Sequence, residues 1–412
     1  MELVKSRLLS DGSAWHIGSL SAVYLSQGLS GGTLFALTTY LVSIGASVGD
    51  ISLLLSITMV PWTLKVFLGP LIDSFTVKKF GRRRFWVLLS QIIMILAVTP
   101  LIFIEVTEVN TVLISLLTLH NAFVAISDIA IDALAADSLR EDQLGSANGF
   151  MWGSKTLGRG LGMALATSIF YSQGVNVGYF VLVLMMCTTF LFPLFSHEMS
   201  HKAGFEFESY KDRLSLKDLV SGISQSLVNK SAVAAIIFML FSNIAYGIFD
   251  VIYNEFYMKV LGWSGEDIGS IRPIGMWIGG VIGLTAGVLS LYLGKRYLLM
   301  FFLSSQILLF FVLSSFSIET SRLFASSVLI GIDAFDAGFM VLIFSILMAL
   351  CVTQTSATNF GIFMGFGNIS ALIGNNLAPI VLGSGNYSFA FVCAGLTLIP
   401  CLLCTLYLTR SS

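Results

Sequence analysis

Long runs of apolar residues, separated by short polar connectors, make up almost all of this chain. A membrane-spanning helix needs roughly 20 consecutive apolar residues, so the pattern predicts about twelve transmembrane helices. One long polar stretch, residues 197–230, divides them into two sets. We expect the helices near residues 17–43, 50–73, 85–106, 110–136, 146–172, 175–196, 229–257, 266–292, 297–317, 322–350, 357–383 and 387–409.

The expected domain organisation is two six-helix halves joined by a polar loop. A weak internal repeat supports it, because Gly69-x3-Asp73-x7-Gly81 follows the second helix and Gly283-x3-Gly287-x6-Gly294 follows the eighth. Halves related in this way are typical of secondary transporters. The predicted boundaries are 1–200 for the N-terminal half, 201–228 for a cytoplasmic central loop and 229–412 for the C-terminal half.

Composition places the chain in a membrane and argues against metal or nucleic-acid chemistry. The mean hydropathy is +0.89 and 11% of residues are charged, whereas soluble domains carry about 25% charge. Cys401 and Cys404 form a C-x-x-C pair, but no second pair accompanies them. We interpret both as small buried residues inside a helix. We therefore expect an all-α membrane protein, monomeric, with no cofactor, no metal and no nucleic-acid partner.

The distribution of Lys and Arg predicts how the chain is oriented. Cytoplasmic connectors carry an excess of these residues. With the N-terminus inside, sixteen of them fall on the cytoplasmic side and only Lys259 and Arg322 on the other. Both termini are thus predicted to be cytoplasmic.

Several charged residues of the N-terminal half lie within predicted spans, where a charge costs roughly 2.5–3.5 kcal/mol. Asp128 and Asp132 are four residues apart on the fourth helix, and Lys155 and Arg159 are four apart on the fifth. Antiparallel packing would bring Asp128 level with Lys155. The four residues could form an ion-pair ladder between two helices, or a charged cavity wall that exchanges partners during transport. Asp128 and Asp132 are candidates for proton coupling.

The C-terminal half carries a second set of intramembrane charges. Asp250 on the seventh helix, near Tyr246, can pair with Arg272 on the eighth. Asp333 and Asp336 are three residues apart on the tenth helix, with no cation in that run. Two close carboxylates cannot both ionise easily at low dielectric, so either is a candidate proton carrier. Alternatively, Asp333 caps or hydrogen-bonds a broken helix near the outer face.

Cations within spans suggest a solute of opposite charge. Lys65 stands alone on the second helix. It could snorkel to the cytoplasmic side or reach an anionic substrate. Together with Lys155, Arg159 and Arg272 it favours an anionic or zwitterionic small molecule. Further candidate lining residues, each of which could equally be a packed interhelical residue, are Tyr24, Gln27, Asn121 and Tyr246.

The connector between the second and third helices predicts a gate. Asp73 ends a Gly69-x-x-x-Asp73 segment, and a basic turn follows at Gly81. A carboxylate at a helix end can bind neighbouring helix N-termini and basic residues, and so latch one conformational state. The basic partners are Arg82, Arg83 and Arg84.

These motifs resemble a known family. The segments 61–73, Phe80-Gly81-Arg-Arg-Arg84, 127–133 and 347–360 resemble the AmpG muropeptide permease branch of the major facilitator superfamily over nearly the whole chain. The resemblance implies a multi-pass importer in the bacterial inner membrane, driven by the proton gradient and carrying anhydro-muropeptides. It also implies that Lys65, Asp73, Arg82–Arg84, Asp128 and Asp132 occupy functional positions.

Departures from the family pattern keep other substrates open. The fifth helix carries both Lys155 and Arg159, and the seventh both Asp250 and Glu255. Relatives in this branch resemble carriers of polycarboxylate siderophores or CoA derivatives, and the extra cations suit such anions. An efflux pump, a non-transporting sensor and a membrane enzyme are further alternatives. The four scattered histidines offer no clustered catalytic constellation, so we do not expect an enzyme.

Overall fold

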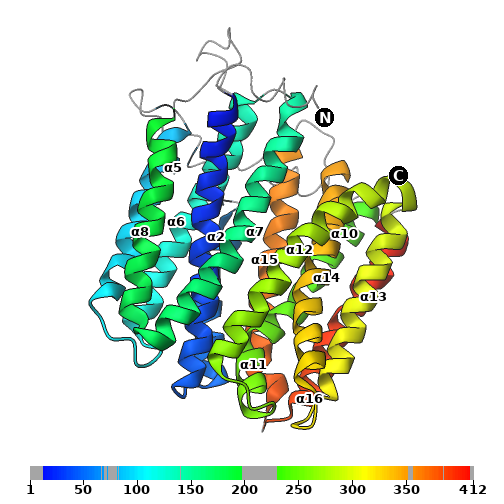
Figure 1. Cartoon of the computed structure of the whole chain (residues 1–412). Helices are drawn as coiled ribbons and strands as arrows, with labels where there is room; N and C mark the ends of the chain where they lie inside the picture. The colour runs from blue at the N-terminus through cyan, green and yellow to red at the C-terminus, as the bar shows by residue number, and fades with distance from the viewer. Residues whose placement is uncertain are drawn as a thin grey trace. The chain divides into compact units, whose positions relative to one another are not determined.

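The computed structural model shows a chain of long helices (Figure 1). It describes residues 13–65, 67–68, 72, 81, 83–139, 141–196, 230–350, 356–383 and 385–408. By contacts between residues, the chain divides into two compact units. Unit 1 comprises 1–37, 67–106 and 111–214, and unit 2 comprises 38–66, 107–110 and 215–412.

Among its described residues, unit 1 contains most of α2, the helices α5, α6, α7 and α8, and one short 3₁₀ turn. The long helix α2 begins in unit 1, and its last residues, from Thr38 on, belong to unit 2. The bounds are α2 Ser13–Ser43, α5 Arg84–Val98, η1 Thr99–Ile102, α6 Thr111–Ser138, α7 Glu141–Ser172 and α8 Val175–Phe195.

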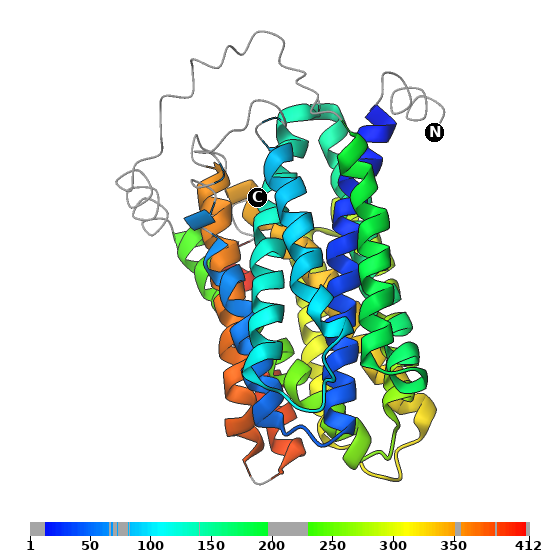
Figure 2. The same ribbon diagram turned by 90° about the vertical axis from the view of Figure 1, so that its left-hand side faces the viewer.

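Unit 2 contains α3 and the helices of the C-terminal part of the chain. Figure 2 shows α3, in blue, beside α15, in orange, and the two pack together. The bounds are α3 Val48–Thr63, α10 Lys230–Ser242, α11 Ile244–Lys259, α12 Gly265–Leu293, α13 Lys295–Ser314, α14 Arg322–Leu350, α15 Ser356–Leu382, α16 Tyr387–Thr397 and α17 Ile399–Leu408.

The helices lie where the hydrophobic pattern predicts them, which confirms the all-α membrane class. Within the described residues, eight segments are long and apolar enough to cross a membrane, and α3 is a shorter apolar helix. Two predicted helices are interrupted. The expected helix 229–257 breaks at Asn243, and 387–409 breaks at Leu398, just before Pro400. At this break the backbone N–H of Asn243 donates to Ser370 Oγ, and its side-chain Nδ2 donates to the carbonyl of Gly367. Both acceptors belong to α15, so a neighbouring helix supplies the hydrogen bonds that the break would otherwise leave unmade.

Helices α3 and α12 begin with the same local device. The backbone N–H of Ser47 donates to the Asp50 carboxylate at 2.9 Å, and the backbone N–H of Asp50 donates to Ser47 Oγ at 3.2 Å. Ser264 and Asp267 form the same two bonds at 2.9 and 3.1 Å. This reciprocal capping box satisfies backbone N–H groups that a helix start would otherwise leave unpaired. Each box therefore fixes the first residue of its helix.

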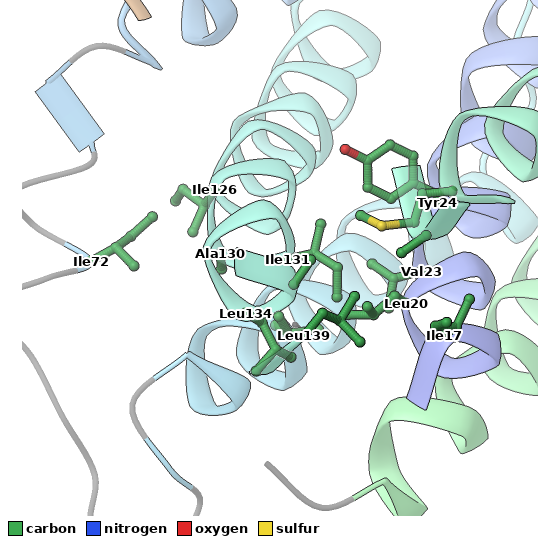
Figure 3. Close-up of a cluster of buried hydrophobic side chains, with 14 residues drawn as sticks. Ile17, Leu20, Val23, Tyr24, Ile72, Ile126, Ala130, Ile131, Leu134 and Leu139 are labelled. Atoms are coloured by element: carbon green, nitrogen blue, oxygen red, sulfur yellow. The ribbon is translucent and has the colours of Figure 1, made fainter. Parts of the chain in front are cut away.

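A buried apolar cluster of unit 1 includes Tyr24 at its edge (Figure 3). Leu20, Val23 and Tyr24 of α2 pack against Ile131 and Leu134 of α6. Apolar burial of this kind orients the two helices, and it leaves the Tyr24 ring fixed with its hydroxyl at the edge of the cluster.

Glycines allow α2 and α7 of unit 1 to touch backbone to backbone. A Cβ on Gly32 would lie 1.9 Å from Arg159 O, and a Cβ on Gly162 would lie 2.2 Å from Leu29 O. Gly28 faces Lys155 O at 2.1 Å in the same way. Close approach through small residues is the usual packing of membrane helices. It sets the depth of Lys155 relative to Tyr24.

Unit 2 uses the same device twice. On α15, a Cβ on Gly374 would lie 2.4 Å from Ile244 O of α11. On α12, a Cβ on Gly275 would lie 3.0 Å from the Cα of Ile330 and 3.2 Å from the Cβ of Asp333. The second contact brings α12 close to α14 and so carries Arg272 to the level of Asp333.

Candidate functional site

In unit 1, Lys155 and Asp128 form the ion pair that their spacing predicts. Lys155 Nζ donates to Asp128 Oδ1 at 3.0 Å, and the side chains are 11% and 7% exposed. The ammonium also lies 5.1 Å from the ring centres of both Tyr24 and Trp152. Aromatic faces attract a cation, most strongly where water is excluded. The lysine is thus held between one carboxylate and two rings.

Tyr24 adds a contact to this group that sequence reasoning missed. Its hydroxyl donates to Asp132 Oδ1 at 2.5 Å. The ring is buried, whereas Asp132 is exposed. Residues 24 and 132 come from different helices, and no spacing rule relates them, so only the helix packing reveals the pair. We had placed Tyr24 among the lining residues, without this partner.

Arg159 lies one turn beyond Lys155 on α7 and is exposed. Its guanidinium carbon is 5.8 Å from the centre of the Phe35 ring. Trp152, one turn before Lys155, is also exposed. One face of α7 therefore presents an indole, an ammonium and a guanidinium at successive turns.

Two other predicted lining residues of unit 1 lie apart from the lysine. Gln27 is buried, and its Nε2 is 3.5 Å from Ser127 Oγ. Asn121 lines a small cavity with Ser30, His120 and Tyr179. Gln27 thus contacts α6 through Ser127, and Asn121 lies at a small pocket with Ser30, His120 and Tyr179.

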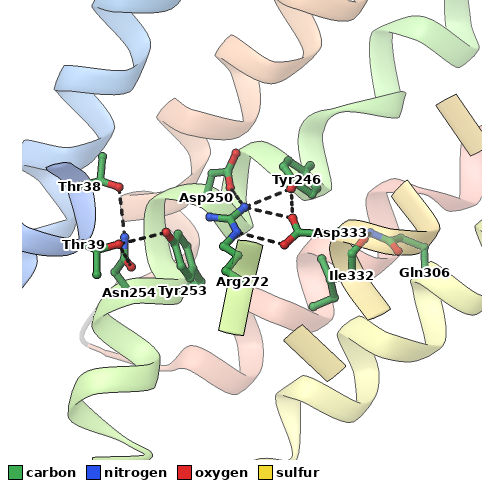
Figure 4. A network of polar contacts seen from close by, with 10 residues as sticks. All are labelled: Thr38, Thr39, Tyr246, Asp250, Tyr253, Asn254, Arg272, Gln306, Ile332 and Asp333. Atoms are coloured by element: carbon green, nitrogen blue, oxygen red, sulfur yellow. Dashed lines mark hydrogen bonds and ion pairs between the residues drawn. The ribbon is translucent and has the colours of Figure 1, made fainter. Parts of the chain in front are cut away.

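In unit 2, Arg272 binds two carboxylates from different helices (Figure 4). Its Nη2 is 2.5 Å from Asp250 Oδ1 on α11, and its Nε is 3.3 Å from Asp333 Oδ2 on α14. The Asp250–Arg272 pairing that we expected is confirmed. The Tyr246 hydroxyl donates to Asp333 Oδ1 and accepts from Arg272 at 3.1 Å.

Three aromatic rings complete the surroundings of Arg272, which is fully buried. The ring centres of Tyr253, Phe249 and Tyr246 lie 4.1, 5.3 and 5.8 Å from its guanidinium carbon. A buried charge is tolerated only with partners of opposite sign or with polarisable faces. Arg272 has both.

The structure shows which neighbours Asp333 has. Asp333 does not cap a break in its own helix, because α14 runs unbroken from Arg322 to Leu350. It does accept a hydrogen bond from Tyr246 of α11, the helix that begins after the break at Asn243. Asp336, one turn further, is half-buried. The stretch of α14 around Asp333 and Asp336 holds no cation, since Arg322 lies at the first residue of the helix, but α12 supplies Arg272. The like-charge argument was therefore incomplete for Asp333.

A polar network next to this cluster involves residues that we had not assigned. Thr39 Oγ1 donates to Asn254 Oδ1 at 2.9 Å, and Asn254 Nδ2 donates to Thr38 Oγ1 at 3.3 Å (Figure 4). Further along α11, Glu255 accepts from both Lys259 and Tyr387 at 2.8 Å. These contacts tie the end of α2 and the start of α16 to α11.

The predicted gate is only partly visible. Gly69, Asp73 and Arg82 lie outside the described residues. Arg83 Nε donates to Asp137 Oδ2 of α6 at 3.1 Å, and Arg84 donates to the backbone carbonyls of Pro193 and Leu194 at the end of α8.

Two more predicted residues stand near this connector. Gly81 has a φ of +88°, which a residue with a side chain rarely adopts. Lys65 is half-buried, and its Nζ is 5.4 Å from the centre of the Trp62 ring.

The chain matches the sequence profile of the Major Facilitator Superfamily over residues 20–375. The chain belongs to the major facilitator superfamily. The family resemblance drawn from the motifs is thereby confirmed, and so is the fold. Members of this superfamily are membrane transporters of small molecules, so the chain is a multi-pass transporter and not an enzyme.

Similar proteins carry transporter names. A Rickettsia typhi protein named "Putative transporter AmpG 3" is 25% identical over 388 residues, covering 90% of each chain. A Synechocystis protein named "Folate-biopterin transporter" is 28% identical over 192 residues, which are 45% of this chain and 37% of that protein. Among solved structures, a mutant of the nucleoside transporter NupG aligns with a TM-score of 0.73. The alignment covers 96% of this chain and 100% of the NupG chain, with 14% sequence identity. Identity at that level supports the fold alone.

Proposed function

We propose that this superfamily member imports an anionic organic solute, an anhydro-muropeptide, across the bacterial inner membrane together with protons. The observation that carries the proposal is the Lys155–Asp128 pair beside Tyr24, Asp132 and Arg159. Intramembrane ionisable residues are costly and usually serve transport. The Rickettsia relative named "Putative transporter AmpG 3", which aligns over 90% of its length, supports the AmpG-like branch from which the muropeptide is inferred.

The coupling follows from partner exchange at Lys155. While Asp128 is ionised, its carboxylate binds the Lys155 ammonium at 3.0 Å. A proton on Asp128 removes that charge and weakens the bond, so the ammonium becomes available to a carboxylate of the solute. Loss of the proton on the other side restores the ion pair and displaces the solute. Alternating access between the two halves would then carry solute and proton together.

A polycarboxylate siderophore is a second candidate, with a CoA derivative in the same class of anions. The observation that favours it is the exposed Arg159 one turn from Lys155, because two cations on one face suit a ligand with several carboxylates. Exposed Trp152 on the same face suits a ring-bearing ligand and so fits the muropeptide as well.

Uptake into proteoliposomes tests the function and separates the two solutes. We expect labelled anhydro-muropeptide to accumulate when the interior is alkaline, and an Asp128→Asn variant to lose this accumulation while still exchanging labelled for unlabelled solute. Exchange needs no net proton movement, so it should survive. Glu319→Gln, at an exposed turn between α13 and α14, is the matched charge-removing control and should accumulate solute normally.

The same vesicles supplied with a ferric polycarboxylate siderophore give the contrasting result. Uptake of the siderophore alone would transfer the function to iron acquisition. Equal accumulation with and without a pH gradient would contradict proton coupling for either solute.

A further inference from the structure

Arg159 of α7 is an exposed guanidinium within a predicted span, and no carboxylate of the described residues pairs with it. Its neighbours come from α2, which lies beside α7 (Figure 1). The Phe35 ring centre is 5.8 Å from the guanidinium carbon, and a Cβ on Gly31 would be 4.0 Å from Arg159 Nε. Neither neighbour carries a charge. A cation at membrane depth is costly unless an anion balances it, so this guanidinium suits an anion that arrives with the solute.

The other cation on this face of α7 is already engaged. Lys155 donates to Asp128 at 3.0 Å and lies 5.1 Å from the ring centres of Tyr24 and Trp152. In the cycle proposed above, the ammonium becomes available to the solute only after Asp128 takes up a proton. Arg159 needs no such step. The two cations therefore differ: Arg159 can bind an anion in either protonation state of Asp128, and Lys155 in only one.

Exposed side chains in the stretch 150–159 of α7 fall on two sides of the helix. Phe150 and Leu157 form one side, and Trp152 and Arg159 form the other. Each member of the second pair follows a member of the first by two residues, which is about 200° around a helix. The first side is wholly apolar and suits contact with lipid. The second carries a guanidinium, which is costly in lipid, so this side suits a path open to water and solute.

The exposed polar side of α7 ends at Arg159. Met163, one turn further along the same face, is buried, and so are Ala166 and Phe170. Trp152 stands on the same side, and the two positions are about 10.5 Å apart along the helix at 1.5 Å per residue. A solute lying along this side would meet a guanidinium at the closed end and an indole about 10 Å away.

The two ends of this side bind different chemical groups. A guanidinium presents a planar fork of N–H donors that fits a carboxylate with two parallel hydrogen bonds. The Trp152 indole is 46% exposed and offers a flat apolar face against which a ring can pack. The Tyr24 ring meets this indole edge-on at 6.0 Å between ring centres, which restrains its orientation.

We propose that Arg159 binds a carboxylate of the peptide part of the solute and that the sugar ring packs on Trp152, so that the muropeptide lies along α7 with its peptide toward Met163. The inference rests on the proposed import of an anhydro-muropeptide and adds how the solute is held. Lys155, between the two, takes a second carboxylate once Asp128 is protonated. A polycarboxylate without a ring would use the cations alone.

Binding of modified solutes tests the carboxylate contact. The full-length transporter in nanodiscs is titrated with labelled anhydromuramyl tripeptide and with the form whose peptide carboxyl groups are amidated. For the wild type, amidation should weaken binding about 10- to 100-fold, the range for hydrogen bonds to a charged group. Arg159→Gln should bind the free acid weakly and respond much less to amidation. Arg159→Lys keeps the charge without the planar fork, so its affinity should fall between the two.

A solute without the sugar tests the indole contact. Trp152→Leu should weaken binding of the sugar-bearing solute about 3- to 10-fold and leave competition by the free tripeptide unchanged. The matched control is Phe150→Leu, which removes an aromatic ring that is 58% exposed from the opposite side of α7. It should bind both solutes like the wild type.

The outcomes separate this inference from the proposed function. A wild type insensitive to amidation, a tripeptide that does not compete, or an Arg159→Gln variant as sensitive to amidation as the wild type would overturn the role of Arg159 and leave proton-coupled import intact. Equal losses for both solutes in Trp152→Leu would show that the indole acts through Lys155, and the ring contact would be wrong. Wild-type protein that neither binds nor accumulates the muropeptide would remove the proposed function itself, and this inference with it.

Discussion

At the scale of single residues, Arg272 shows how unit 2 keeps a charge at membrane depth. Its guanidinium is fully buried, binds Asp250 and Asp333, and stacks near three aromatic rings. Removing one member of such a buried group leaves the others uncompensated, which costs far more than loss of an exposed ion pair. Stability should therefore depend on this one cation.

Arg272→Ala tests that dependence. We expect it to lower the free energy of unfolding by about 3–5 kcal/mol, because two buried carboxylates lose their cation. The measurement is denaturant unfolding in detergent, followed by circular dichroism or tryptophan fluorescence. Arg322→Ala is the matched control, since Arg322 pairs with Asp267 and lies near Trp263 but is 61% exposed. It should cost about 1 kcal/mol or less; equal losses in the two variants would contradict the argument.

The same scale shows which site contacts could be predicted from the sequence. The pairs Asp128–Lys155 and Asp250–Arg272 follow from charge and depth, because an unpaired charge inside a span is costly. The Tyr24–Asp132 and Tyr246–Asp333 contacts could not be predicted, since a neutral phenol need not seek a partner of opposite charge. The second carboxylate of Arg272 was missed because α12 and α14 are not consecutive in the chain, whereas the two predicted pairs each join consecutive spans.

At the scale of helices, hydropathy locates the spans but not the places where they bend or meet. The breaks at Asn243 and Leu398 interrupt runs that remain apolar throughout, so hydropathy predicts a single helix in each case. The fifth span contains Gly158, Gly160 and Gly162, small residues that allow a close helix contact. The helix that packs against these glycines is α2, through Gly28 and Gly32. Only the structure shows this, because a glycine allows any neighbouring helix to come close and does not specify which one does.

Gly162→Ala should disturb this crossing. The added Cβ would stand 2.2 Å from Leu29 O, a backbone atom that cannot move aside without shifting α2. We expect a loss of about 1–3 kcal/mol of stability, together with weaker solute binding, because α7 carries Lys155 and Arg159. Thermal unfolding in detergent and equilibrium binding of labelled muropeptide measure the two effects.

Gly153→Ala is the control on the same helix, since a Cβ there meets no atom within 4 Å. It should match or exceed the wild type in stability, as alanine favours a helix more than glycine does. If Gly162→Ala proved as stable as Gly153→Ala, the crossing of α2 and α7 through glycine would be refuted.

At the scale of the whole molecule, the charged connectors predict the orientation in the membrane. Sixteen Lys and Arg residues are assigned to one side and two to the other. Such an imbalance orients multi-span proteins during insertion. The start of α13, which carries Lys295 and Arg296, should then be cytoplasmic. The turn between α13 and α14, which contains Glu319, should face the opposite side.

Labelling of single cysteines checks this orientation. All five native cysteines are replaced, and Arg296→Cys and Glu319→Cys are introduced separately into that background. Both positions lie at or beside a helix end and should be accessible once the membrane is opened. In right-side-out vesicles, a maleimide that cannot cross the membrane should label Glu319→Cys at once and Arg296→Cys only after permeabilisation. The reverse pattern would place the termini outside. The face of the protein assumed to be cytoplasmic would then be the outer face. A proton gradient directed inward would reach the charged residues from the opposite end, and the direction of transport would have to be reassigned.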